Sequence, residues 1–124
     1  MARAVNCKMI KTKSVYDTVE ESDGQRILVS RYWPRGLSRE RLSLTEHLKD
    51  TAPSVELLQD WKKGNISWDE YKNRYYKEMA QQQETISKLA KMACDKTITL
   101  LCFEREEDPH CHRHLLKDLI EKSK

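Results

Sequence analysis

The feature that most constrains this chain is the stretch TITLLCFEREEDPHCHR near its C-terminus. Residues 97–103 are a nearly continuous apolar run with a β-branched start, which is typical of a strand buried on both faces. Acidic residues follow, and then Asp108 and Pro109 suit the N-cap and the first position of a helix. We therefore expect a strand over 97–103, an acidic loop and a helix over 109–122. Open α/β proteins build binding sites on this arrangement.

The preceding residues predict two more strands and a series of helices. Strand patterns cover residues 4–10 and 26–33, and a polar loop is expected over 11–25 between them. Three serines precede segments of helical periodicity and are the predicted N-caps, namely Ser38, Ser54 and Ser67. The helix after Ser38 is expected to include Leu48 and to end before Pro53. The helical segment that follows Ser67 is the longest, and the glutamines at 81–83 predict a bend or break within it.

The order of these elements predicts the fold class. A long, mostly helical segment separates the second and third strands, which favours a right-handed crossover between parallel strands. We expect an α/β fold with a small parallel, or mostly parallel, sheet flanked by helices. Residues 1–124 are expected to form a single, three-layer-like domain, because the chain is long enough for one core.

Composition narrows the classes of function. The net charge of +3 arises from 23 basic and 20 acidic residues, which is too balanced to indicate nucleic-acid binding by itself. No apolar run has the length of a membrane span or of a signal-peptide core, so we expect a cytoplasmic protein with no membrane partner. The chain has only three glycines and no phosphate-binding glycine-rich loop, and we predict no cofactor.

The cysteines and histidines show no regular metal-binding motif. The four cysteines lack zinc-ligand spacing, and we expect them to be reduced thiols. His110 and His114 have helical ligand spacing, but two histidines alone make a weak site, so no metal is predicted. Cys102 lies in the apolar strand and is interpreted as an inert small hydrophobic residue.

Polar residues are expected to converge at the carboxyl edge of the sheet, where the ends of parallel strands meet. Arg31, Trp33 and Arg35 follow the second strand, Glu104 follows the third, and the sequence Cys-His-Arg at 111–113 opens the last helix. We expect Arg31 or Arg35 to lie near Glu104 or near the start of this helix. A structural ion pair of these arginines with Glu104 or Glu106 is the alternative.

A helical wheel distinguishes the histidines of the last helix. Leu115, Leu116, Leu119 and Ile120 form an apolar arc, and His112 falls near its centre. Cys111 and Arg113 flank this arc, while His110 and His114 fall on the solvent side. We therefore expect a buried His112. A core histidine satisfied by a hydrogen bond is the alternative to a functional one.

Three stretches of the sequence resemble one known family. They are DGQRILVSRYWPRGLSRERLSL, APSVELLQDW and ITLLCFEREEDPHCHRHLLKDLI. They are similar to the domain-of-unknown-function 488 family, and especially to its small YeaO-like branch, over residues 15–120. The resemblance implies a single α/β domain and no established reaction, so it supplies no catalytic role. The matching positions are Arg31, Trp33, Pro34, Arg35, Gly36, Leu101, Cys102, Glu104, Cys111, His112 and Arg113.

Three functions are open from the sequence. The first, which we favour, is an enzyme or ligand-binding domain for a small anionic molecule that bears phosphate or carboxylate, for example a nucleotide. The second is a nucleic-acid-associated module in which Trp33 stacks on bases. The third is a thiol or redox protein that uses Cys111, although we expect this thiol to be accessible and not strongly activated.

The favoured function assigns roles to residues of both motifs. The candidates for catalysis are His112, Cys111 and Glu104. The predicted ligand-binding residues are Arg31, Trp33, Arg35, Gly36 and Arg113.

Overall fold

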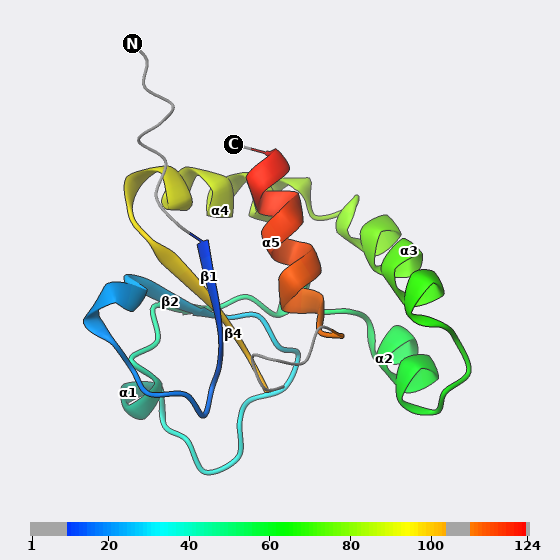
Figure 1. The fold of residues 1–124 in the computed structure, drawn as a ribbon, viewed down its shortest axis with the longest axis horizontal. Helices are drawn as coiled ribbons and strands as arrows, with labels where there is room; N and C mark the ends of the chain where they lie inside the picture. Colours follow the sequence, from blue (N-terminus) through cyan, green and yellow to red (C-terminus); the bar gives the residue numbers. More distant parts are fainter. Residues whose placement is uncertain (1–9, 104–109, 124) are drawn as a thin grey trace.

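A computed structural model describes residues 10–103 and 110–123 (Figure 1). Its strands form a four-stranded sheet in the order β1-β4-β2-β3. Each pair of neighbouring strands is parallel. The strands are β1 (Ile10–Ser14), β2 (Gln25–Leu28), β3 (Glu46–His47) and β4 (Ile98–Cys102). The predicted α/β class with a parallel sheet and a crossover between β2 and β4 is confirmed.

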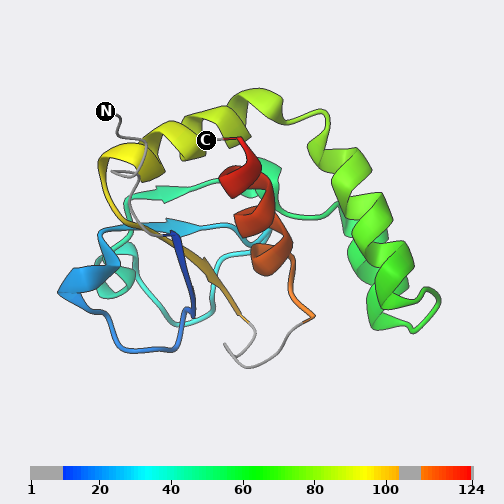
Figure 2. The same ribbon diagram turned by 45° about the horizontal axis from the view of Figure 1, so that its top comes forward.

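Helices lie on both sides of the sheet (Figures 1 and 2). The α-helices are α1 (Arg39–Leu42), α2 (Val55–Lys62), α3 (Trp68–Met79), α4 (Gln83–Asp95) and α5 (His112–Lys122). Two short 3₁₀ turns, η2 (Glu21–Asp23) and η3 (Lys49–Thr51), join strands to the next elements. The three predicted serine N-caps are confirmed, because their hydroxyls accept hydrogen bonds from the first turns of α1, α2 and α3. The break at the glutamines is confirmed as well, since it separates α3 from α4.

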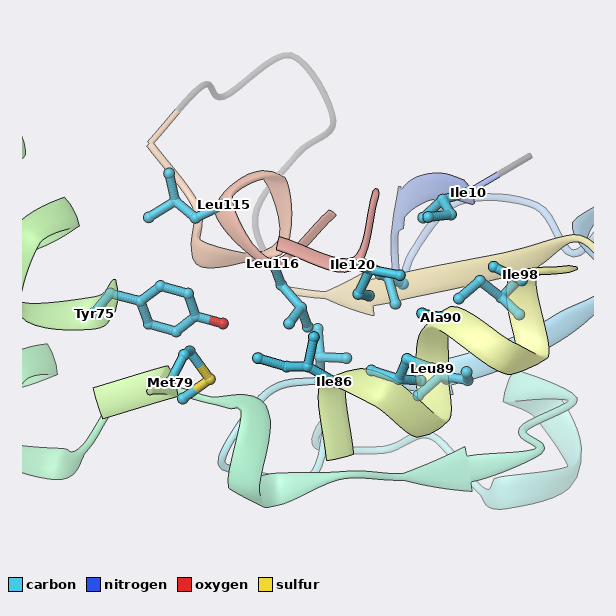
Figure 3. Close-up of a cluster of buried hydrophobic side chains, with 14 of the residues drawn as sticks. Ile10, Tyr75, Met79, Ile86, Leu89, Ala90, Ile98, Leu115, Leu116 and Ile120 are labelled. Carbon is cyan, nitrogen blue, oxygen red and sulfur yellow. The ribbon is translucent and has the colours of Figure 1, made fainter. Parts of the chain in front are cut away.

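The larger core lies between the sheet and three helices. Side chains of α3, α4 and α5 form one cluster with Ile10 of β1 and Ile98 of β4 (Figure 3). Ile27 and Leu100 join this core, whereas their neighbours Leu28 and Leu101 face a smaller cluster around Leu42 of α1. β2 and β4 are the two central strands and have buried apolar side chains on both faces, and for β4 this burial agrees with the apolar run over 97–103.

Three strand predictions need correction. β1 occupies Ile10–Ser14, where a polar loop was expected, and the predicted strand over residues 4–10 lies outside the described residues except for Ile10. A lysine-bearing segment forms this strand because the buried carboxylate of Asp23 pairs with Lys11 and Lys13. β2 ends at Leu28 instead of continuing to residue 33, since the chain bends from Ser30 onward.

Two helix predictions also need correction. α1 ends at Leu42 because Ser43 adopts a left-handed conformation with φ 48°, and the following residues form the unpredicted β3. α5 begins at His112, three residues later than expected, because Cys111 is extended (φ −133°, ψ 140°) and is its N-cap. The predicted cap, Asp108, lies outside the described residues.

Candidate functional site

A cavity of about 310 Å³ lies at the carboxyl edge of the sheet. Residues that follow β2, the end of β4 and the start of α5 line one part of it, and residues of α2 and α3 line another. Arg31 and Cys111 both line this cavity, so the two sequence motifs meet at one edge as expected. Glu104 lies outside the described residues, and its predicted proximity to an arginine stays a prediction.

Basic side chains stand at several points around the cavity. Arg31 is half-buried, and its Nε donates a hydrogen bond to the carbonyl of Pro53 at 2.9 Å, which fixes the base of the guanidinium. Lys62, at the end of α2, and His110, just before α5, are both exposed. The first turn of α5 adds the positive end of a helix dipole. Among the described residues that line the cavity, the ionisable side chains outside the cysteines and the tyrosines are therefore all basic.

Two aromatic side chains, Trp61 and Tyr71, also line the cavity, and Trp68 packs against both of them. Tyr71 and Trp68 of α3 are stacked with their ring centroids 4.8 Å apart at an interplanar angle of 17°. Trp61 of α2 lies 5.5 Å from Tyr71, and the His110 ring packs against both tryptophans at 4.8 and 5.7 Å. The cavity thus combines an aromatic surface with basic groups.

His112 lines the cavity and is buried, as the helical wheel predicted. It is only 4% exposed, and His110 is exposed, so both predictions are confirmed. The prediction for His114 is wrong, since it is half-buried. Nε2 of His112 forms a 2.8 Å hydrogen bond with the carbonyl of Val29, and its ring centroid lies 5.8 Å from that of Tyr75.

Two cysteines accompany His112. Potential ligand atoms of Cys102, Cys111 and His112 lie within 4.8 Å of one another, and all three residues are buried. The prediction of an accessible Cys111 is wrong, because this residue is 2% exposed. A hydrogen bond with Cys102 and burial together raise the pKa of the Cys111 thiol well above its ordinary value, and the opposing effect of His112 is smaller. In this form of the protein Cys111 is a neutral thiol at neutral pH.

Other predicted ligand residues lie elsewhere in the described part of the chain. Arg35 is exposed, and Gly36 has a φ of 77° in a turn. Trp33 donates a hydrogen bond from Nε1 to the carbonyl of Leu37, and its ring packs against His47. None of these three is among the residues that line the cavity. Their ligand-binding role stays a prediction, and the cavity gives it no support.

Arg113 has a different position from the one expected. It is fully buried, and its guanidinium donates hydrogen bonds to the carbonyls of Lys13 at 3.0 Å and Cys102 at 3.5 Å. Lys13 is the penultimate residue of β1 and Cys102 is the last residue of β4, so Arg113 joins α5 to the carboxyl-terminal parts of both strands. Its predicted contact with a ligand stays a prediction, while these bonds indicate a structural role.

Several cavity residues were missed by sequence reasoning. The helical spacing of Trp68, Tyr71 and Tyr75 predicts a core stripe, and Cys102 was interpreted as an inert strand residue, whereas Tyr71 and Cys102 line the cavity. Trp61 and Lys62 were not considered for the site. Their only sequence signal is an aromatic residue beside a lysine at the end of a helix, which is common on helices that have no site.

The fold and the site thus define an α/β domain. Its cavity lies at the ends of the strands and is lined by both basic and aromatic side chains. Residues 10–124 match the family model described as the active DUF488-N3 subclade, and the chain belongs to this DUF488 family. The expected family membership is confirmed.

The relatives show the same affiliation. The chain is 39% identical to the uncharacterized protein YeaO of Escherichia coli (strain K12) over 111 residues, which are 90% of this chain and 96% of the relative. It is 30% identical over 90 residues to uncharacterized proteins of Mycobacterium bovis and Mycobacterium tuberculosis, covering 73% of this chain and 75% of each relative. No solved structure matched the chain. No helix within the described residues is long and apolar enough to cross a membrane.

Proposed function

We propose that the cavity binds a small anionic ligand that also carries a planar, apolar part, as a nucleotide does. The observation that carries this proposal is the composition of the cavity wall. It contains Arg31, Lys62 and His110 together with the aromatic rings of Trp61 and Tyr71. Basic side chains and a helix N-terminus recognise phosphate or carboxylate, while aromatic rings stack on planar groups.

Catalysis on this ligand is the form of the proposal that we favour. The matching family model is described as an active subclade, which supports an enzyme over a passive binding protein. In the metal-free chain His112 is the candidate for catalysis, because it lines the cavity, its ring is held by the Val29 carbonyl, and no metal occupies its Nδ1. Cys111 also lines the cavity but is a poor free nucleophile, since burial and its bond with Cys102 raise its pKa.

The two alternatives have less support. A redox or thiol function needs an activated cysteine, and the raised pKa of Cys111 opposes activation. A nucleic-acid function would use Trp33 for stacking, but this ring packs on His47 and its Nε1 bonds to Leu37. The net charge of +3 also provides no strong electrostatic attraction to nucleic acid.

The test compares two arginines that the sequence could not distinguish. Binding of adenosine monophosphate, adenosine and inorganic phosphate is measured by calorimetry on the unmodified chain and on the variants Arg31→Gln and Arg35→Gln. We expect the monophosphate to bind best and Arg31→Gln to weaken it about tenfold or more, since a charged hydrogen bond contributes roughly 1.5–3 kcal/mol. Arg35→Gln, the matched control, should bind as the unmodified chain does.

Each other outcome has a defined meaning. Equal affinity in the Arg31→Gln chain, with its fold verified by circular dichroism, would contradict the proposed site. Loss of binding in the Arg35→Gln chain alone would favour the ligand position expected from the sequence motif. A salt-dependent shift of RNA or DNA by the unmodified chain, without binding of the monophosphate, would support the nucleic-acid alternative.

A further inference from the structure

Three potential metal ligands converge where β4 ends and α5 begins. Cys102 is the last residue of β4, Cys111 is the N-cap of α5, and His112 is the first residue of that helix. Their ligand atoms all lie within 4.8 Å of one another, and the three side chains are buried. Two features of the backbone bring them together. Cys102 lies at the end of a central strand, and Cys111 has an extended backbone just before the start of α5.

The histidine has the proton arrangement that a metal ligand needs. A carbonyl oxygen only accepts hydrogen bonds, so the 2.8 Å contact with Val29 requires a proton on Nε2 of His112. In the neutral ring Nδ1 then carries the free lone pair, and Nδ1 lies 4.0 Å from Sγ of Cys111. A metal-bound histidine commonly donates its other ring N–H to a backbone carbonyl in this way.

We propose that Cys102, Cys111 and His112 bind a zinc ion. Zinc binds sulfur at about 2.3 Å and nitrogen at about 2.0 Å in tetrahedral geometry, which requires a sulfur–nitrogen separation of about 3.6 Å. The separation of 4.0 Å between Cys111 Sγ and His112 Nδ1 is therefore larger by only a few tenths of an ångström. A small rotation of buried side chains closes the site around the ion.

The chemistry of the three donors selects the ion. Two cysteines and one histidine favour zinc over magnesium or calcium, which prefer oxygen ligands. On binding, each thiol loses one proton to solvent and the two thiolates balance the double positive charge of the ion. Because the resulting centre is neutral, it is compatible with the buried position of all three residues.

The cluster has three protein ligands within the described part of the chain, and all three also line the cavity. Three protein ligands with an open fourth position are the pattern of catalytic zinc sites, whereas structural sites have four protein ligands. The open position is directed to the cavity, where it takes water or an anionic group of a ligand. This last step rests on the proposed function, while the binding of zinc does not.

The experiment measures metal binding without any organic ligand. The reduced, metal-free full chain is titrated with Zn²⁺ and with Co²⁺, and bound metal is quantified by mass spectrometry. We expect one ion per chain, and for Co²⁺ intense visible bands of a tetrahedral ion with a thiolate-to-metal charge-transfer band. Cys102→Ser and Cys111→Ser should each weaken zinc binding at least about 100-fold, because loss of a ligand exceeds the 10- to 100-fold effect of a second-shell change.

A matched control is provided by a third cysteine. Cys94, on α4, is half-buried and is not part of the cluster, so Cys94→Ser should bind zinc as the unmodified chain does. Cobalt spectra of the unmodified chain do not depend on the folding of any variant. A metal-free chain that takes up no Co²⁺, a cobalt spectrum without thiolate bands, or a Cys102–Cys111 disulfide that forms in place of metal uptake would overturn the proposal.

The two proposals can fail separately. If the chain binds zinc but has no affinity for adenosine monophosphate, the proposal of an anionic ligand is contradicted and the proposal of a zinc site is supported. Affinity for the monophosphate that depends on Arg31, in a chain that takes up neither Zn²⁺ nor Co²⁺, would contradict the zinc site and support the ligand site.

Discussion

At the scale of single residues, Asp23 is the most heavily paired acid in the described structure. Its carboxylate is fully buried and receives hydrogen bonds from Lys11, Lys13 and Arg26. Burial alone raises the pKa of Asp23, but these hydrogen bonds and one from the Glu20 backbone outweigh it and hold the pKa well below its ordinary value. The carboxylate therefore joins β1 to β2 through charge.

Replacement of this acid should be strongly destabilising. Asp23→Asn keeps the shape of the side chain but leaves three cations around a neutral group. We expect the free energy of unfolding in urea to fall by roughly 3–5 kcal/mol near neutral pH, the usual cost of breaking a buried ion pair. Glu121→Gln, an exposed change in the last turn of α5, is the control and should stay within about 0.5 kcal/mol of the unmodified chain.

The pH dependence separates charge from packing. Since the folded-state pKa of Asp23 is depressed below the ordinary value of 3.8, its stabilisation is present above that pH and is lost as the pH falls below it. The difference in unfolding free energy between the unmodified and Asp23→Asn chains should therefore shrink between about pH 5 and pH 2. A difference that stays constant over this interval would show that the variant acts through packing instead.

The sequence predicts the burial of some side chains but not of others. The burial of His112 follows from the apolar arc of α5, because the periodicity of a helix is a local property. The burial of Cys111 and its proximity to Cys102 do not follow from the sequence. These residues belong to different elements and meet only through the path of the chain between β4 and α5, so cysteine spacing predicted no metal site.

At the scale of elements, helix starts are predicted better than strands. Ser38, Ser54 and Ser67 cap helices as expected, because a capping hydroxyl bonds to a backbone N–H only two or three residues away. β1 was not expected because its lysines are paired by an acid from another element, and β3 was not expected because its strand spans two residues. Such tertiary pairing overrides local propensity.

The cap of α3 provides a prediction at this scale. The Ser67 hydroxyl accepts a hydrogen bond from the Glu70 backbone N–H at 3.1 Å on an exposed helix start. We expect Ser67→Ala to lower the free energy of unfolding by about 1 kcal/mol. Ser87→Ala, at an exposed interior position of α4, is the control and should have no cost, since alanine is the better helix former. Equal effects of the two substitutions in urea unfolding would contradict the role of the cap.

At the scale of the whole molecule, the parallel sheet explains why the two sequence motifs share a cavity. β2 and β4 are neighbours and run in the same direction, so both deliver their following residues to one edge. This convergence was predictable from the order of the elements. The aromatic wall was not, because the packing of Trp61 of α2 against Trp68 and Tyr71 of α3 depends on tertiary contacts that local periodicity does not specify.

The alignment of β2 with β4 depends on one glycine. Gly24 precedes β2 with a φ of 63°, and a Cβ built on it would lie 2.1 Å from the backbone oxygen of Thr97. That oxygen accepts a hydrogen bond from the backbone N–H of Gln25 at 3.0 Å, and the Thr99 hydroxyl donates one to the Asp23 carbonyl at 2.7 Å. A side chain at Gly24 would therefore separate the two central strands where their pairing begins.

We expect Gly24→Ala to be among the most damaging single substitutions in the chain. The backbone conformation of Gly24, with φ 63° and ψ −130°, alone costs a non-glycine residue about 1–3 kcal/mol, and the contact with Thr97 adds to this cost because a paired strand backbone cannot move away freely. The free energy of unfolding in urea should fall by at least about 3 kcal/mol. The hydrogen-exchange protection of β2 and β4 amides should fall with it, because both strands lose their common register.

Gly64 offers a matched control for this substitution. Its φ of 75° is also in the left-handed region, but a Cβ there would meet no atom within 4 Å. Gly64→Ala should therefore carry only the backbone cost of about 1 kcal/mol and leave exchange in the sheet unchanged. If the two alanine variants unfold with the same free energy, the close approach of Gly24 to Thr97 does not determine strand pairing. The expected result is a larger loss of unfolding free energy for Gly24→Ala, with faster hydrogen exchange confined to β2 and β4. This result would show that the close approach of Gly24 to Thr97 sets the register of the two strands, which brings both motifs to the cavity.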